Sequence, residues 1–229
     1  MYKNSHAMKL LLFVFIFSAT ALRTLAQTGT IDELELRPLR LPALQEVEGS
    51  PFMTSDYKTG AVVISDTKEV TGVPVKFNIM NNAVMVQKDG QDLKLENFKQ
   101  VSYDVIASDG SSRKVILRTG YPDVEKNSSK TVYQVISMGP KLHLLKLLTQ
   151  KVEDAPTLGE YSRREIVTTE QYFVYVPGGE IKKIKLSKKE VTAAVPSLSA
   201  RIEEIAGAKD LKLKNESDFV TLVDEINKP

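Results

Sequence analysis

Apolar and polar residues alternate along most of residues 60–186, a period of two that is typical of β-strands with one buried face. In residues 73–79 the odd-numbered positions are apolar, and Pro74, Lys76 and Asn78 lie between them. Proline cannot donate a backbone hydrogen bond, so we expect Pro74 at a sheet edge or a bulge. The middle of this chain is therefore constrained to form a sheet.

Turn signals separate the expected strands. Three pairs of residues that tolerate positive φ predict tight hairpins: Asn81-Asn82, Asp89-Gly90 and Asp109-Gly110. Pro177, Gly178 and Gly179 predict a further turn, which follows residues 172–176. Both faces of residues 172–176 are apolar, which indicates a central place in the sheet. Residues 142–148 fit neither strand nor helix period cleanly, and we interpret them as a strand.

The period changes at Ser187, which with Glu190 forms a capping-box pattern typical of a helix start. Pro196 divides the helical pattern that follows, and Gly207 is the expected stop. Asn215 is expected to cap a last helix. Its apolar residues share one face: Phe219, Leu222, Val223 and Ile226. The pattern of residues 187–229 therefore predicts two to three short helices that pack on the sheet.

These patterns together predict an α+β protein that is mainly β. Residues 52–186 are expected to form an antiparallel β-meander, or a curved sheet or partial barrel, because turns rather than long helices separate the strands. Residues 27–51 contain Pro38, Pro42 and Pro51 and are expected to form an extended N-terminal segment.

The first 26 residues have the order of a cleavable signal peptide. Lys3 and Lys9 precede an apolar run, residues 10–22, and Ala26 ends a small-residue cleavage motif before Gln27. The run has 13 residues, whereas a helix that spans a bilayer needs about 20. We therefore expect export to the periplasm or the medium, with no transmembrane segment after cleavage.

Composition narrows the function classes further. The leader holds three of the 31 basic residues and no carboxylate, so the mature chain would carry 28 basic against 29 acidic residues and a net charge of −1. Nucleic-acid binding is not favoured by that balance. The chain has no cysteine. This excludes disulfides, thiolate metal sites and cysteine nucleophiles.

Candidate catalytic groups are few. His143 is the one histidine beyond the leader, because His6 leaves with it, and we interpret His143 as a structural or surface residue of a strand. Two pairs of carboxylates lie close in sequence, Glu165 with Glu170 and Glu203 with Glu204, and neither stands out. No glycine-rich phosphate loop and no cofactor motif occurs. The sequence predicts no catalytic residue and no cofactor.

Two surface features are open to alternative readings. Five lysines form a dense run that could bind an anion, although such runs are usually only solvated: Lys182, Lys183, Lys185, Lys188 and Lys189. Asn127 and Asn215 match the N-glycosylation triplet, but Asn215 is better explained as a helix cap.

Several segments resemble an uncharacterised family of exported proteins of Gram-negative bacteria. The likeness lies in residues 48–52, residues 73–79, the tyrosine-rich strand before Pro177, the lysine-rich capped helix, and residues 211–214 before the last helix. The resemblance implies a leader, a β-rich middle and paired C-terminal helices. Its motifs are structural, so it implies an exported location but no activity and no site residues.

Three function classes follow. The first is a non-enzymatic binding or structural module of the cell envelope or secretome, with an unidentified envelope or extracellular partner. The second is an envelope hydrolase that uses His143 or a carboxylate pair. The third is a carrier of an apolar ligand inside a curved sheet, which requires inward residues that line a cavity rather than pack.

Overall fold

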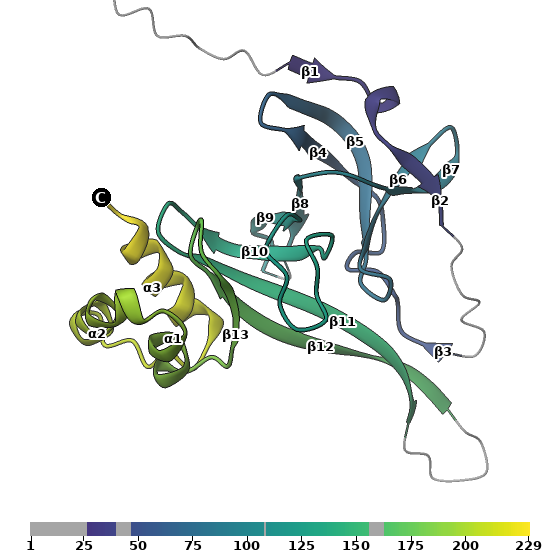
Figure 1. The fold of residues 1–229 in the computed structure, drawn as a ribbon. Helices are drawn as coiled ribbons and strands as arrows, with labels where there is room; N and C mark the ends of the chain where they lie inside the picture. The colour runs from purple at the N-terminus through teal and green to yellow at the C-terminus, as the bar shows by residue number, and fades with distance from the viewer. Residues whose placement is uncertain (1–26, 40–46, 108, 156–162) are drawn as a thin grey trace, which may run out of the picture.

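A computed structural model describes residues 27–39, 47–107, 109–155 and 163–229. The expected leader, residues 1–26, lies outside the described residues, as do residues 40–46 of the N-terminal segment. The chain is mainly β, with one open, curved sheet and three α-helices at the C-terminus (Figure 1). The predicted α+β class is confirmed.

The strands lie in the following order along the chain: β1 (Gln27–Gly29), β2 (Leu36–Pro38), β3 (Val47–Glu48), β4 (Lys58–Ser65), β5 (Lys68–Asn78), β6 (Ala83–Lys88), β7 (Gln91–Leu95), β8 (Gln100–Ile106), β9 (Ser112–Arg118), β10 (Tyr133–Met138), β11 (His143–Ala155), β12 (Arg163–Tyr175) and β13 (Ile181–Ile184). A 3-10 turn, η1 (Ile31–Glu33), separates β1 from β2. The helical elements are α1 (Lys188–Ala194), η2 (Pro196–Leu198), α2 (Ser199–Ala208) and α3 (Glu216–Asn227).

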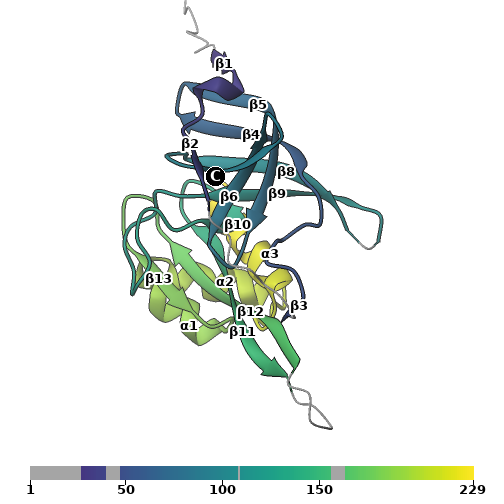
Figure 2. The same ribbon diagram turned by 90° about the vertical axis from the view of Figure 1, so that its right-hand side faces the viewer.

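Most neighbouring strands in the sheet are also neighbours in sequence. The order is β13-β12-β11-β10-β9-β8-β4-β5-β6-β7-β2, so β4 lies between β8 and β5 (Figure 2), and β2 pairs with β7 at one end although the two are far apart in sequence. The N-terminal segment adds short strands to this sheet: β1 pairs parallel to β5, β3 parallel to β12, and β2 antiparallel to β7. The two parallel pairs make the sheet mixed rather than purely antiparallel.

The turn chemistry read from the sequence sets the hairpins. Asp89 and Gly90 have φ of 51° and 74°, the left-handed pair that joins β6 to β7. Asn82 has φ of 47° at the end of the β5–β6 turn, and Gly178 has φ of 77° between β12 and β13. Within residues 71–74 of β5, the described strands give hydrogen-bonded neighbours on the β4 side only. The other side of Pro74 is therefore an edge of the sheet among the described residues.

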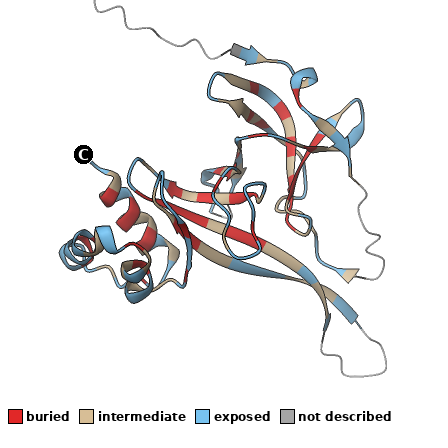
Figure 3. Cartoon of the chain, viewed as in Figure 1, coloured by how far each residue is buried: buried red, intermediate tan, exposed pale blue. Residues whose placement is uncertain are grey.

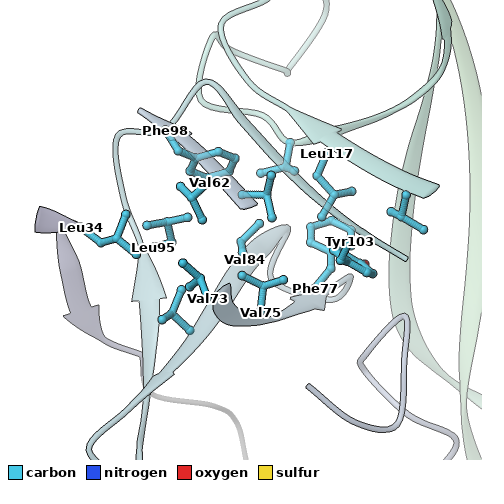
Figure 4. Packing of buried hydrophobic residues seen from close by; sticks show 14 of the residues in the cluster. Leu34, Val62, Val73, Val75, Phe77, Val84, Leu95, Phe98, Tyr103 and Leu117 are labelled. Carbon is cyan, nitrogen blue, oxygen red and sulfur yellow. The ribbon is translucent and has the colours of Figure 1, made fainter. Parts of the chain in front are cut away.

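Strands β4 to β9 curve around a first core on their inner face (Figure 4). Val75 and Phe77 of β5 are fully buried there, as the period of two predicts, and they pack with Tyr103 and Leu117 from β8 and β9. Leu148 of the long strand β11 also reaches this core. The interior of this half of the sheet is filled with side chains.

The part of strands β10 to β13 that lies beside the helices is covered on both faces. Leu144 and Val174 pack against α1, α2 and α3 on one face, in a second core. Leu145 and Phe173 point to the opposite face, where residues 119–132 cover them in a third core. The double burial explains why residues 142–148 match no single period, since every apolar residue in that run is buried (Figure 3).

The helices begin at the predicted caps. Ser187 accepts a hydrogen bond from the Glu190 amide and Asn215 accepts one from the Asp218 amide. η2 begins at Pro196, which confirms the predicted break. The predicted stop at Gly207 was wrong by one residue, because α2 runs to Ala208.

The residue that ends α2 is not the expected glycine. Asp210 has φ of 50° and takes the left-handed position that glycine usually fills. The Leu211 amide donates to the Ala206 carbonyl and the Asp210 amide donates to the Gly207 carbonyl, which are the two hydrogen bonds of a Schellman cap.

α3 is tied to the sheet at both ends. Near its start, the Glu216 carboxylate lies 2.5 Å from the Lys146 ammonium and accepts a hydrogen bond of 2.9 Å from the Tyr172 hydroxyl. Near its end, Asp224 accepts a hydrogen bond from Ser137 at 2.6 Å. Its four predicted apolar residues, from Phe219 to Ile226, are buried in the second core. No described helix has the length and apolar character needed to cross a membrane.

Candidate ligand-binding pocket

His143 begins β11 and is buried, with 7% of its surface exposed. Its Nδ1 lies 3.2 Å from the Tyr121 hydroxyl, and the ring also forms a hydrogen bond with the backbone of Gly139. Burial lowers the pKa of His143 below its ordinary value of 6.5, and the positive charge of Arg118 adds to the shift. The ring is therefore held between two protein partners, as in a structural histidine.

An aromatic cluster surrounds this histidine. Tyr121 meets Tyr133, His143 and Tyr175 edge to face, with ring centroids 5.2–5.9 Å apart. Burial raises the pKa of Tyr121 and of Tyr133 to about 12, so both hydroxyls stay protonated near neutral pH. This cluster is part of the third core.

The two carboxylate pairs do not converge. Glu165 and Glu170 are five residues apart on β12, and an odd separation places their side chains on opposite faces of a strand. On α2, Glu203 forms an ion pair with Lys188, whereas Glu204 pairs with Arg201 at 2.8 Å. The geometry gives neither pair a shared position for a substrate.

The lysine run extends from β13 into the start of α1. Lys182 and Lys183 are adjacent on β13 and so point to opposite faces. They pair with Glu180 at 3.6 Å and with Glu125 at 3.3 Å. Lys188 pairs with Glu203, and Lys185 and Lys189 are solvent-exposed. Because Lys182 and Lys183 point to opposite faces of β13, these two lysines do not share one anion-binding surface.

The two glycosylation triplets have structural roles. Asn127 closes a tight turn with Val124 through reciprocal backbone hydrogen bonds, and its side-chain nitrogen, where a glycan would be attached, is buried. Asn215 uses its side-chain oxygen to cap α3.

A pocket that the sequence did not indicate lies where four segments meet. These are the start of β6, the connection from β7 to β8, the end of β9 and the residues that lead into β10. The cavity has a volume of about 330 Å³ and is partly open to solvent. That volume falls at the lower end of the range for small-molecule sites.

The buried part of the pocket lining, called the floor below, is apolar. It consists of five buried residues: Ala83, Val84, Leu95, Phe98 and Val132. All but Ala83 belong to the first core, and Figure 4 shows Val84, Leu95 and Phe98 within it. A ligand group in contact with this floor would rest on side chains whose other sides are already packed.

Three lysines and one glutamate provide the charges of the lining. Lys94 pairs with Glu96 at 2.9 Å, and both line the pocket. Lys99 pairs at 2.8 Å with Asp66, whose side chain is 90% exposed and lies outside the lining. Lys130 forms no ion pair within the described part of the chain. The hydrogen bond from Asn97 is the main cause of the lowered pKa of Glu35, and the charge of Lys130 adds a smaller effect.

Hydrogen bonds fix the walls. The Asn82 side chain donates to the Val132 carbonyl at 2.9 Å and accepts from the Val132 amide at 2.8 Å. The Gly120 amide donates to the Ser129 carbonyl at 2.7 Å, and the Thr119 hydroxyl donates to the Phe98 carbonyl. The pocket is therefore preformed by contacts between segments that are distant in sequence.

Comparison with known proteins gave no match. No protein-family model fits the chain, and neither a characterised protein nor a solved structure is significantly similar to it. The pocket and the sequence are therefore the features from which a function can be inferred.

Proposed function

We propose that the mature chain is an exported, non-enzymatic binding module and that the pocket beside Lys130 is its ligand site. The observation that carries this proposal is the combination of a preformed cavity of about 330 Å³, an apolar floor and a charged rim. Most small-molecule sites join apolar walls to a few fixed polar groups.

Binding is favoured over hydrolysis by the positions of the reactive groups. His143 lies in the third core with Tyr121 and Gly139 as partners, and it does not line the pocket. Glu96 is the one carboxylate of the lining, and it is held by Lys94. The lining thus brings together binding groups without a histidine base or a second carboxylate.

The packed interior favours a surface site over a carrier of an apolar ligand. Phe77, Tyr103 and Leu117 fill the concave side of the curved sheet and are almost completely buried. A ligand inside the curve would have to displace these side chains. The pocket beside Lys130 needs no such displacement.

Export is supported by the leader pattern of residues 1–26. N-terminal sequencing of protein recovered from the envelope and the medium should find Gln27 as the first residue. Retention of Met1 in cytosolic protein would contradict export.

The ligand site is tested by amide chemical-shift mapping with a set of small organic acids and neutral aromatic compounds. Compounds that bind should shift amides around Leu95, Phe98 and Val132. In Ser129→Trp the exposed Ser129 side chain becomes a bulky ring at the pocket mouth, and binding should be lost. The control Ser112→Trp changes an exposed serine outside the lining and should bind normally. Shifts confined to other surfaces, or equal binding by Ser129→Trp, would refute the site.

A further inference from the structure

We infer that the pocket binds a small organic carboxylate with a compact apolar group, and that Lys130 supplies the cation that meets the carboxylate. This inference rests on the proposed function, because it assigns a ligand class to the same pocket. It follows from the size of the cavity, the chemistry of its floor and the hydrogen bonds already formed in its walls.

The floor specifies an apolar part of the ligand. Burying an apolar group against Leu95, Phe98 and Val132 removes its surface from water, which contributes roughly 25 cal/mol for each Å². A volume of about 330 Å³ suits one ring or a short branched chain rather than a long acyl chain.

The walls leave few neutral donors for a ligand. The Asn82 side-chain nitrogen donates to Val132, the Asn97 side-chain nitrogen donates to Glu35, and the Gly120 amide donates to Ser129. The Thr119 hydroxyl is also occupied by the Phe98 carbonyl. The Ser129 hydroxyl and the second N–H of each amide have no partner among the described contacts, but they are neutral, so the ammonium groups of the rim are the donors that a carboxylate would bind most strongly.

Among those ammonium groups, Lys130 is the most available. Lys94 and Lys99 each have an acidic partner within 3 Å. Lys130 is exposed and forms no ion pair among the residues described, and its charge acts on Glu35 only beyond ion-pair distance, so a ligand carboxylate would displace no ion pair.

The balance of charge favours one carboxylate over other ligands. A cation would meet three lysines and a single glutamate that Lys94 already neutralises. A polyphosphate would place further negative charge beside Glu96 and would gain little from the apolar floor. A monocarboxylate matches both parts of the lining.

The test compares benzoate, benzamide and benzylamine as probes of nearly equal shape that differ in charge. Dissociation constants are measured on the full mature chain by amide-shift titration. Benzoate should bind about fivefold more tightly than benzamide, as expected for a partly exposed charge pair. Benzylamine should bind more weakly than both, and added salt should weaken benzoate alone.

Two matched variants assign the cation. Lys130→Met keeps an unbranched side chain but removes the charge, and it should weaken benzoate about two- to fivefold while benzamide is unchanged. Lys126→Met removes an exposed charge from the same segment, outside the lining, and should leave both dissociation constants unchanged.

The outcomes separate the two levels of the proposal. Equal binding of benzoate and benzamide at the pocket would overturn the carboxylate preference and leave the binding function intact. Equal losses in Lys130→Met and Lys126→Met would overturn the role of Lys130. If none of the probes shifted the pocket amides, both the ligand class and the proposed site would be wrong.

Discussion

The side-chain amide of Asn227 forms two hydrogen bonds with the backbone of Leu142. Its Oδ1 accepts from the Leu142 amide at 3.0 Å, and its Nδ2 donates to the Leu142 carbonyl at 2.8 Å. The same Oδ1 accepts from the Lys141 amide at 2.9 Å. The last residue of α3 thus takes the place of a strand partner at the turn that leads into β11.

Asn227→Ala should therefore destabilise the whole protein by about 1–3 kcal/mol, because it leaves partly buried backbone groups without partners. Urea denaturation measures this change. Lys228→Ala, at the next residue, alters an exposed side chain and should stay within about 0.5 kcal/mol of the wild type. Equal stability of Asn227→Ala and the wild type would show that these hydrogen bonds contribute nothing net.

Two glycines should respond in opposite directions to alanine. A Cβ on Gly139 would overlap the Asn227 side chain, so Gly139→Ala must displace that side chain from its hydrogen bonds with Leu142 and lower the melting midpoint. A Cβ on Gly207 in α2 meets nothing within 4 Å, so Gly207→Ala should stabilise by roughly 0.5–1 kcal/mol. A neutral Gly139→Ala would contradict the close approach of α3 to the β10–β11 turn.

Phe219→Ala tests whether the helices and the sheet unfold together. Phe219 is completely buried in the second core, where a Phe→Ala change costs about 3–5 kcal/mol. Because α3 shares that core with Leu144 and Val174 of the sheet, we expect one cooperative transition at a lower temperature. The exposed Ser217→Ala serves as a control. A separate early transition in Phe219→Ala, with the sheet melting unchanged, would show independent helices.

The pH dependence of stability should include a contribution from His143. Burial lowers its pKa below 6.5, so the unfolded chain takes up the proton first as the pH falls. The unfolding free energy that depends on neutral His143 is fully present above about pH 6.5 and is lost as the pH falls through the lower pKa of the folded state. Wild type should therefore lose more unfolding free energy than His143→Gln between pH 7.5 and about 5.5. A difference between the two proteins that is constant over this range would contradict the shifted pKa.

The elements of the fold were predictable because their signals are local. The alternation around Phe77, the Asp89-Gly90 turn and the cap at Asn215 each depend on neighbouring residues, and the structure has them as predicted. The α2 terminus was misplaced because Asp210, not glycine, adopts the left-handed conformation. Such a cap depends on hydrogen bonds that a residue-type preference does not specify.

The pocket was not predictable in the same way. Asn82 was recognised as a turn residue, but its hydrogen bonds to Val132, 50 residues away, require the curved sheet to bring two distant segments together. Lys130 is separated in sequence from the other charges of the pocket, whereas three lysines of the conspicuous run at residues 182–189 already have acidic partners. The sequence alone does not specify these ion pairs or the segments that the sheet brings to the pocket.

The most direct test of the binding proposal is a crystal structure of the mature protein with 4-bromobenzoate, with the bromine located by its anomalous scattering. We predict a bromine peak over the floor formed by Leu95, Phe98 and Val132, with the carboxylate directed toward Lys130. Lys130→Met crystals should show a weaker peak at the same place. A peak at another surface, or an unoccupied pocket in crystals of protein that binds the compound in solution, would contradict the proposal.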